Sequence, residues 1–178
     1  MDDALLHFRP AHALGAGIAR AFKDEQAEIL SLLPHAEVLH TGATSVPAAL
    51  TRGDLDIHVR VSSAEFSGAR DALGGIYASY RTETWTGEFA TFIALDASIA
   101  TGIALTAIGG EHDHRFIIGW DRLACDRRLL EEYNALKLKY DDTADADSYE
   151  AAKSTFFSAL VAGDPDSPAA RGRKRAGR

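Results

Sequence analysis

Cysteine is almost absent from this 178-residue sequence, in which Cys125 is the single thiol. One cysteine excludes a disulfide bond within the chain and is typical of proteins that work in a reducing compartment. The first ten residues, MDDALLHFRP, are acidic and contain no apolar core, so we expect no secretion signal. Both absences favour a cytoplasmic location.

Long hydrophobic runs are also lacking, with one exception. Residues 89–108, FATFIALDASIATGIALTAI, are apolar overall but are interrupted by Asp96, Ser98 and Thr101. The stretch is rich in Ile, Thr and Phe, which favours two adjacent β-strands over one membrane-spanning helix. We therefore expect no membrane segment here.

Positive charge is scarce outside the C-terminus. The formal net charge is −7, but the last eight residues, RGRKRAGR, carry five positive charges, and residues 1–170 carry a net charge of −12. An acidic body is a poor partner for nucleic acid, because phosphate contacts need Lys and Arg. Only the basic tail is suited to nucleic acid, as in an RNA-modifying enzyme, and a solubilising tail is the alternative.

The remaining composition is that of one globular domain. Hydrophobic residues make up 46% and charged residues 25% of the chain, which is long enough to bury one core. We predict a single domain over residues 1–163. Residues 164–178 hold turn-forming and cationic residues with nothing to bury, which predicts a disordered basic tail.

Periodicity predicts an α+β (α/β) fold, in which a helix is followed by a mixed sheet with one crossover helix and by a helical C-terminal third. Apolar residues at helical spacing and capping signals indicate helices, whereas alternating or β-branched runs indicate strands. The predicted helices are residues 13–33, 62–75, 115–125, 127–140 and 147–161. The predicted strands are residues 36–40, 54–61, 76–80, 89–96 and 99–108.

The predicted strand DLDIHVRV, residues 54–61, has acids on one face. Alternation places Leu55, Ile57, Val59 and Val61 on one face, and Asp54, Asp56, His58 and Arg60 on the other. The α-carbons of the two acids should lie roughly 6–7 Å apart. Two carboxylates at that spacing can bind one divalent cation or bracket two, and Mg²⁺ prefers carboxylates together with phosphate oxygens.

A turn of small residues, GATS, precedes these acids. Gly42, Thr44 and Ser45 would let backbone N–H groups approach a phosphate, and Arg52 is placed for a bidentate phosphate contact. Together with the acids, they predict a site for metal-assisted phosphoryl or nucleotidyl transfer. The alternative is a solvated strand face, which is the commoner reason for an isolated Asp-x-Asp pair.

Other polar residues allow two interpretations each. His58 shares the face of the acids and is either a base or third ligand, or a side chain that completes a polar cleft. His112, Asp113 and His114 either bind zinc or form a loop in which Asp113 caps the next helix, and we favour the loop. Cys125 is expected to be a packed helix thiol.

The segment TGATSVPAALTRGDLDIHVRV, residues 41–61, resembles the signature of the GrpB-like family within the nucleotidyltransferase superfamily. That signature runs Gly-Ser-Thr-Ser-Val-Pro-Gly-Leu, then Lys, then a strand bearing Asp. One branch has Thr-Lys-Gly-Asp-Leu-Asp where this chain has residues 51–56. Two later segments, LLEEYNALKLKY and SYEAAKSTFF, are similar to family helices with the patterns Glu-Tyr-x-x-Leu-Lys and Tyr-x-x-x-Lys-x-x-Phe.

The resemblance implies a nucleotidyltransferase fold, a small mixed sheet flanked by helices with the metal-binding acids on one strand. It also implies binding of a nucleoside triphosphate. It implies that Gly42 and Ser45 lie against a nucleotide phosphate, and that Asp54 and Asp56 hold Mg²⁺ or Mn²⁺. The implied reaction transfers a nucleotidyl group to a hydroxyl or amine of a small molecule or a protein.

The resemblance also covers two lysines of the C-terminal helices. Lys137 and Lys153 match lysines in the family's helical patterns. They are expected to face the same cleft as the acids and to contact the nucleotide.

Three departures from the family pattern favour a different function. Ala43 replaces a Ser of the turn, and Trp120 replaces an Arg that precedes Asp121. No later strand offers the third carboxylate that superfamily enzymes commonly carry, because Asp96 ends its strand. The alternative is therefore a non-catalytic nucleotide-binding or accessory protein that kept the fold.

Overall fold

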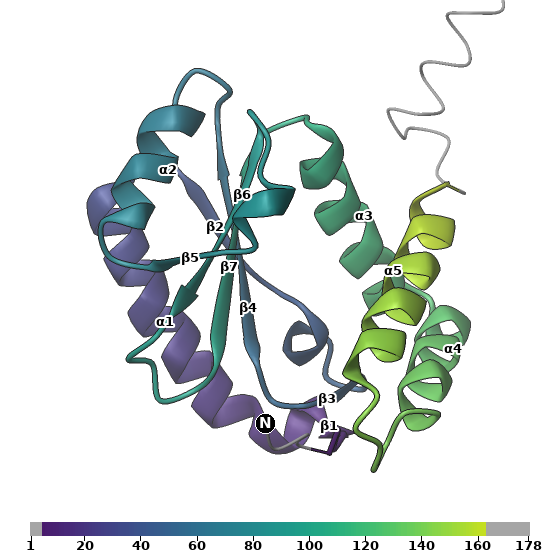
Figure 1. Cartoon of the computed structure of the whole chain (residues 1–178). Coiled ribbons are helices and arrows are strands. Elements are labelled where there is room, and N and C mark those ends of the chain that lie inside the picture. The colour runs from purple at the N-terminus through teal and green to yellow at the C-terminus, as the bar shows by residue number, and fades with distance from the viewer. Residues whose placement is uncertain (1–4, 163–178) are drawn as a thin grey trace, which may run out of the picture.

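The computed structural model describes residues 5–162, and its centre is a five-stranded mixed sheet (Figure 1). In spatial order the strands are β2 (Glu37–Thr41), β4 (Leu55–Val61), β7 (Thr101–Ala107), β6 (Phe89–Ala94) and β5 (Ala78–Tyr80). Strands β4 and β7 are parallel, and the other neighbouring pairs of this sheet are antiparallel. The predicted α+β class with a mixed sheet is confirmed.

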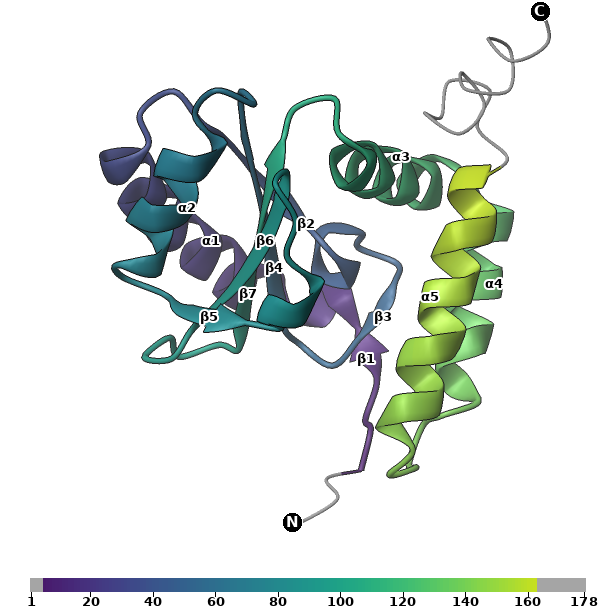
Figure 2. The ribbon, with the colours of Figure 1, turned by 45° about the horizontal axis from the view of Figure 1, so that its top comes forward.

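Helices cover both faces of the sheet, as Figures 1 and 2 show. Helices α1 (Gly15–Leu32) and α2 (Phe66–Gly74) lie on one side, and α3 (Glu111–Cys125), α4 (Arg127–Leu138) and α5 (Ala146–Ala162) are grouped on the other. A two-stranded sheet pairs β1 (Arg9–Pro10) with β3 (Leu50–Thr51). Short 3-10 helices, η1 (Ala11–Leu14), η2 (Ala43–Ser45) and η3 (Thr82–Thr84), complete the described elements.

The main hydrophobic core lies between the sheet and helices α1 and α2. Leu55, Ile57 and Val59 of β4 are at most 1% exposed and pack in one cluster with Ile29 of α1 and Leu73 of α2. Burying such a side chain contributes roughly 1.5–3 kcal/mol, which determines the face of β4 that points inward. The polar face of β4 is thereby turned toward α3, as the alternation predicts.

A second, smaller hydrophobic cluster holds the three C-terminal helices together. It consists of Leu123 of α3, Tyr133 of α4, and Phe157 and Leu160 of α5. Gly119 allows α3 and α5 to approach closely, because a Cβ there would lie 2.9 Å from the Phe157 ring. The sheet and the C-terminal helices therefore have separate cores.

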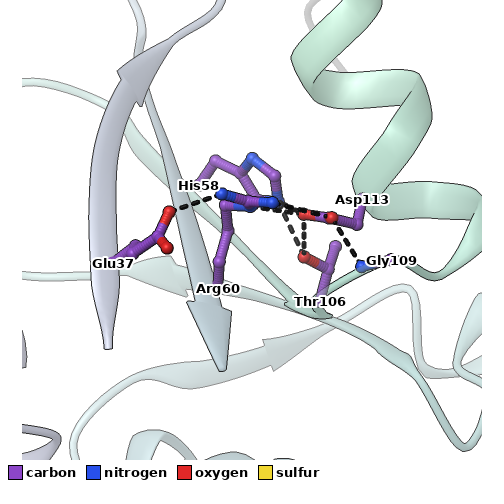
Figure 3. Close-up of polar contacts among 6 residues, drawn as sticks. All are labelled: Glu37, His58, Arg60, Thr106, Gly109 and Asp113. Carbon is purple, nitrogen blue, oxygen red and sulfur yellow. Dashed lines mark hydrogen bonds and ion pairs between the residues drawn. The ribbon is translucent and has the colours of Figure 1, made fainter. Parts of the chain in front are cut away.

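Polar contacts connect β4 to the first turn of α3 (Figure 3). Arg60 donates two hydrogen bonds to the carboxylate of Asp113, at 2.5 and 2.9 Å, and a third to Glu37 of β2. Asp113 also accepts from the backbone N–H of Gly109, at 2.8 Å, and from Thr106, at 3.2 Å. A bidentate arginine–carboxylate pair is among the stronger polar contacts, so it anchors α3 to the sheet.

The sequence prediction for the start of α3 is wrong. The helix begins at Glu111, so residues 112–114 lie in its first turn and not in a loop. Gly110 is the N-cap residue, and Asp113 is buried because Arg60 reaches it from the sheet. A local sequence pattern contains no information about such a distant partner.

The prediction for Cys125 is also wrong, because its thiol is exposed. Leu123 of the same helix reaches the second cluster, and a residue two positions later faces a different side of a helix. Residues 89–108 form β6 and β7, and no helix of residues 5–162 is long and apolar enough to cross a membrane. The predicted domain limits at residues 1 and 163 and the predicted tail, residues 164–178, lie outside the described residues.

We predict that Asp113→Asn lowers the free energy of unfolding by about 3 kcal/mol, because it deprives a largely buried guanidinium of its main partner. The side chains of Arg60 and Asp113 are only 18% and 4% exposed. Glu131→Gln is the matched control, since it breaks an exposed pair with Arg127 and should cost no more than about 1 kcal/mol. Urea denaturation of the three proteins measures both differences.

The same pair makes stability depend on pH. Burial would raise the pKa of Asp113, but hydrogen bonds from Arg60 and Gly109 and the charge of Arg60 hold it below the ordinary 3.8. The stabilisation is therefore complete above pH 3.8 and is lost as the pH falls through the lower pKa of the folded state. The difference between wild type and D113N should shrink in that range, and a constant difference would contradict the pairing.

Candidate functional site

A cavity of about 280 Å³ lies between the start of β4, the turn at η2 and the C-terminal helices. Nine residues are predicted from the sequence to form the site, and six of them line this cavity. The six are Gly42, Arg52, Asp54, Asp56, Lys137 and Lys153. The fold thus brings the predicted acids together with cations that lie 80 to 100 positions later in the chain, on two different helices.

The two carboxylates differ in their partners. Asp54 forms an ion pair with Arg52, with 3.0 Å between a guanidinium nitrogen and a carboxylate oxygen. Asp56 is half-buried, yet within residues 5–162 its carboxylate has no hydrogen bond or ion pair. A half-buried carboxylate without a partner is unfavourable, and a bound cation would offset that cost.

Two glycines lie beside the Asp56 carboxylate, and Gly42 is the one that the carboxylate requires. Gly42 has a φ of +75°, and a Cβ on it would lie 1.9 Å from Oδ2 of Asp56. Gly102 of β7 is the register partner of Asp56, and a Cβ there would lie 3.6 Å from the other oxygen, Oδ1. Gly42 is therefore required by Asp56 itself, independently of the phosphate contact that the sequence predicts.

Asp56 is difficult to ionise in this position. Burial, and then the charge of Asp54, raise the pKa of Asp56 to about 6, while Lys153, Lys137 and Arg52 oppose the rise. A carboxyl pKa above its ordinary value means that the folded protein destabilises the ionised form. A divalent cation beside the two acids would remove that destabilisation, so these donors fit a hard metal ion.

The hydroxyl groups of the turn stabilise the turn itself. Thr44 donates to the backbone carbonyl of Asp54 at 3.1 Å and also contacts Nε2 of His40 at 3.0 Å. Ser45 donates to the carbonyl of Gly42 at 2.7 Å. Neither side chain is among those that line the cavity, so these hydroxyls hold the backbone of the turn in place.

The two predicted lysines reach the cavity from different helices. Lys137 of α4 is 1% exposed, donates to the backbone carbonyl of Leu50 and lies 4.1 Å from the ring centroid of Tyr133. Burial, and then the charge of Lys153, lower the pKa of Lys137 to about 7. Lys153 of α5 is more exposed and forms an ion pair with Glu150 at 2.8 Å. Lys137 therefore connects α4 to Leu50, in the segment that precedes the acids, whereas Lys153 is the more solvent-accessible lysine.

His58 does not line the cavity, although it shares the polar face of β4. It is 1% exposed, lies against the ring of Phe116 and has Nε2 at 2.8 Å from the hydroxyl of Thr106. Thr106 donates its single proton to Asp113, so Nε2 of His58 is the donor in that contact. Burial lowers the pKa of His58 to about 4, although Asp113 opposes the shift. His58 thus belongs to the network in Figure 3.

Most of the aromatic lining of the cavity was not predicted from the sequence. Three helices contribute to this wall, namely α3 with Phe116 and Trp120, α4 with Tyr133 and Lys137, and α5 with Tyr149, Lys153 and Phe157. Within each helix these residues are four positions apart, so they share one helical face. That four-residue spacing of aromatic and cationic side chains is the sequence signal that marks the wall.

A second cavity, of about 410 Å³, adjoins the first. Arg81 and Glu150 are among the residues that line only the second cavity, and Gly102 leaves space there beside the acids. Four residues line both cavities, namely Arg52, Asp54, Asp56 and Lys153. The acids therefore stand between two spaces, each large enough for part of a small ligand.

One group of three side chains in the described part of the chain has the spacing of metal ligands. His7, Asp141 and Asp142 offer ligand atoms within 4.8 Å of one another, and Nδ1 of His7 lies 2.8 Å from the Asp142 carboxylate. His7 and Asp142 are exposed, so a solvated ion pair accounts for the contact. The group does not include His112 or His114, so the zinc interpretation of residues 112–114 gains no support.

Comparison with known proteins gives matches over most of the chain. The family model described as GrpB protein matches residues 16–162. A UPF0157 protein of Vibrio cholerae serotype O1 is 27% identical over 157 residues, which are 88% of this chain and 82% of that protein. The crystal structure of the conserved protein GrpB from Enterococcus faecalis has a TM-score of 0.64 at 15% identity, over 81% of this chain and 92% of that chain.

A looser superposition relates 67% of this chain to 40% of Cid1, an RNA terminal uridylyl transferase, with a TM-score of 0.41 and 17% identity. The family match is broader, since residues 16–162 contain the turn, both acids and the three C-terminal helices. The resemblance of residues 41–61 to the GrpB signature is thereby confirmed, and the chain belongs to the GrpB family.

Proposed function

We propose that this GrpB protein is a metal-dependent nucleotidyltransferase, which uses a nucleoside triphosphate and modifies a hydroxyl or amine of a small molecule or protein. The observation that carries the proposal is the Asp56 carboxylate. It is half-buried, has no hydrogen bond or ion pair within residues 5–162, and lies with Asp54 where two cavities meet. The cations around it suit the phosphates of such a substrate.

Asp54 and Asp56 would hold a Mg²⁺ or Mn²⁺ ion. Both ions prefer carboxylate and phosphate oxygens, and the two acids offer oxygens to the cavities on either side. A bound ion would supply positive charge to the transferring phosphoryl group and the leaving group. Arg52 already neutralises part of the charge of Asp54, so Asp56 is the acid that most needs the ion.

The phosphates would lie against the turn and the nearby cations. Gly42 and Ala43 line the cavity, while the hydroxyls of residues 44 and 45 keep the turn in shape. Arg52 approaches from the chain before β4, and Lys153 approaches from α5. Two cations from separate elements can contact different phosphates, which would position the triphosphate across the acids.

The second cavity suits the acceptor, and it contains a carboxylate that the sequence does not single out. Glu150 of α5 lines this cavity together with Asp54 and Asp56. The acceptor proton would pass to Glu150, the acceptor oxygen or nitrogen would bond to the α-phosphorus, and the bond to the departing pyrophosphate would break. Glu150 suits this role better than His58, because His58 is 1% exposed and lines neither cavity.

A non-catalytic nucleotide-binding protein is the second candidate. Gly102 stands beside Asp56 on β7, and Ala104 is the next residue on that face, so neither position supplies a third carboxylate. Ala43 also removes a hydroxyl from the turn. This candidate shares nucleotide and metal binding with the first and differs from it only in turnover.

We predict that Mg²⁺ or Mn²⁺ raises the melting temperature more when a nucleoside triphosphate is present, because each ligand completes the coordination of the other. Asp56→Asn should abolish that synergy and leave the fold intact. Asp71→Asn is the matched control, because it alters an exposed acid of α2. Differential scanning fluorimetry measures the shifts, and equal synergy in wild type and Asp56→Asn would exclude the acids as a metal site.

Gly42→Ala should weaken metal–nucleotide binding by about 10-fold or more, a loss typical of changes that displace a ligand. The reason is that the added Cβ would overlap Oδ2 of Asp56. Gly68→Ala is the control, because a Cβ at that helical position meets open space. Isothermal titration calorimetry compares the two variants, and unchanged affinity in Gly42→Ala would show that the Asp56 position is not critical.

Glu150→Gln should slow nucleotidyl transfer by about 10²- to 10⁴-fold, as expected for loss of a general base. Nucleotide binding should not weaken, because the variant releases Lys153 from its ion pair with Glu150. Pyrophosphate release across a panel of hydroxyl and amine acceptors provides the rate, and Glu132→Gln alters an exposed acid as control. Loss of transfer in His58→Gln but not in Glu150→Gln would reverse the assignment. Tight binding without pyrophosphate release in wild type would favour the second candidate.

A further inference from the structure

Aromatic rings form much of the wall of the first cavity. Six of its lining residues are aromatic, namely Phe8, Phe116, Trp120, Tyr133, Tyr149 and Phe157. They come from the N-terminal segment and from α3, α4 and α5. Phe116 and Trp120 are only partly buried, so part of each ring is open to the cavity.

Neighbouring rings hold Trp120 in place. Its ring centroid lies 4.9 Å from that of Phe157 and 6.0 Å from that of Tyr133, which it meets edge-on at 73°. Gly119 contributes as well, because its missing Cβ lets Phe157 pack directly against the backbone of α3. A flat surface held in this way loses little freedom when a ring stacks on it, which favours binding.

The polar side chains of this cavity are suited to binding a charged group, and they are poorly suited to distinguishing one base from another. Its polar side-chain groups are those of the cations, the two acids, Thr51, the tyrosines and the indole N–H of Trp120; Asn, Gln, Ser and His are absent from the described lining. In DNA recognition, Asn and Gln are the usual side chains that read adenine, and an Arg fork reads guanine. Arg115 is the cation nearest the aromatic residues in sequence. Its guanidinium donates to the backbone carbonyl and the hydroxyl of Ser154 on α5, so it is not a free fork.

We propose that Trp120 and the rings around it form a stacking site for the base of a nucleoside triphosphate, and that the site discriminates little among bases. The inference rests on the proposed function, since it places the triphosphate at the acids and the turn. Stacking tolerates every base because each base has a π-face. The volume of about 280 Å³ is slightly below the usual range for small-ligand sites, so the cavity suits part of a small ligand and not a segment of a macromolecule.

The experiment compares ATP, GTP, CTP and UTP with inorganic tripolyphosphate, all in the presence of Mg²⁺, by isothermal titration calorimetry on the full chain. The four nucleotides should bind with dissociation constants within about 10-fold of one another, and each should bind more tightly than tripolyphosphate. Trp120→Ala should weaken all four by about 10-fold and leave tripolyphosphate binding unchanged. Trp120→Phe keeps a stacking surface and should restore most of the loss.

The outcomes separate this inference from the proposed function. If neither nucleotides nor tripolyphosphate bind, the proposed function fails. If tripolyphosphate binds as tightly as the nucleotides, or if one base is preferred by more than about 100-fold, the stacking inference is overturned while the phosphate site stands. The wild-type panel decides these points even if Trp120→Ala folds poorly, and a loss confined to one nucleotide in that variant would also overturn the inference.

Discussion

The bidentate contact between Arg60 and Asp113 joins two parts of the chain that otherwise have separate cores. Arg60 belongs to the strand that carries Asp56 and follows Asp54, and Asp113 belongs to the helix that carries Phe116 and Trp120. Helices α4 and α5 pack on α3 through the second cluster, so their positions also depend on this contact. The distance between the acids and the aromatic wall therefore depends on this ion pair, on the ring contacts of α3 with β4 and β6, and on the hydrogen bonds of Asn134 and Lys137 to residues 48–50.

Much of the fold and the position of the acids could be predicted from local sequence patterns. Strand β4 follows its predicted range within one residue, because strict alternation is a local property that burial of Leu55 and Ile57 then enforces. The C-terminal helices follow for the same reason, since their apolar residues recur at helical spacing. The turn before β4 could be predicted from its small residues, although the reason for Gly42 is its contact with Asp56.

The remaining features depend on partners that are distant in sequence, and no local pattern reveals them. Asp113 looks like a helix cap in sequence, but Arg60, 53 positions earlier, draws it into the interior. His58 shares a strand face with the acids, yet α3 covers it and leaves Asp56 open. From the sequence, a third carboxylate is expected on a later strand, whereas Glu150, the acid that lines the second cavity beside Asp54 and Asp56, lies on helix α5.

The separation of the two hydrophobic clusters has a consequence for how the protein unfolds. A part of a protein with its own core can open as a unit while the rest stays folded. The first cavity lies where the sheet and the C-terminal helices meet, and its lining comes from both. A ligand seated there touches both units, so its binding would couple their opening and make unfolding more cooperative than it is in the free protein.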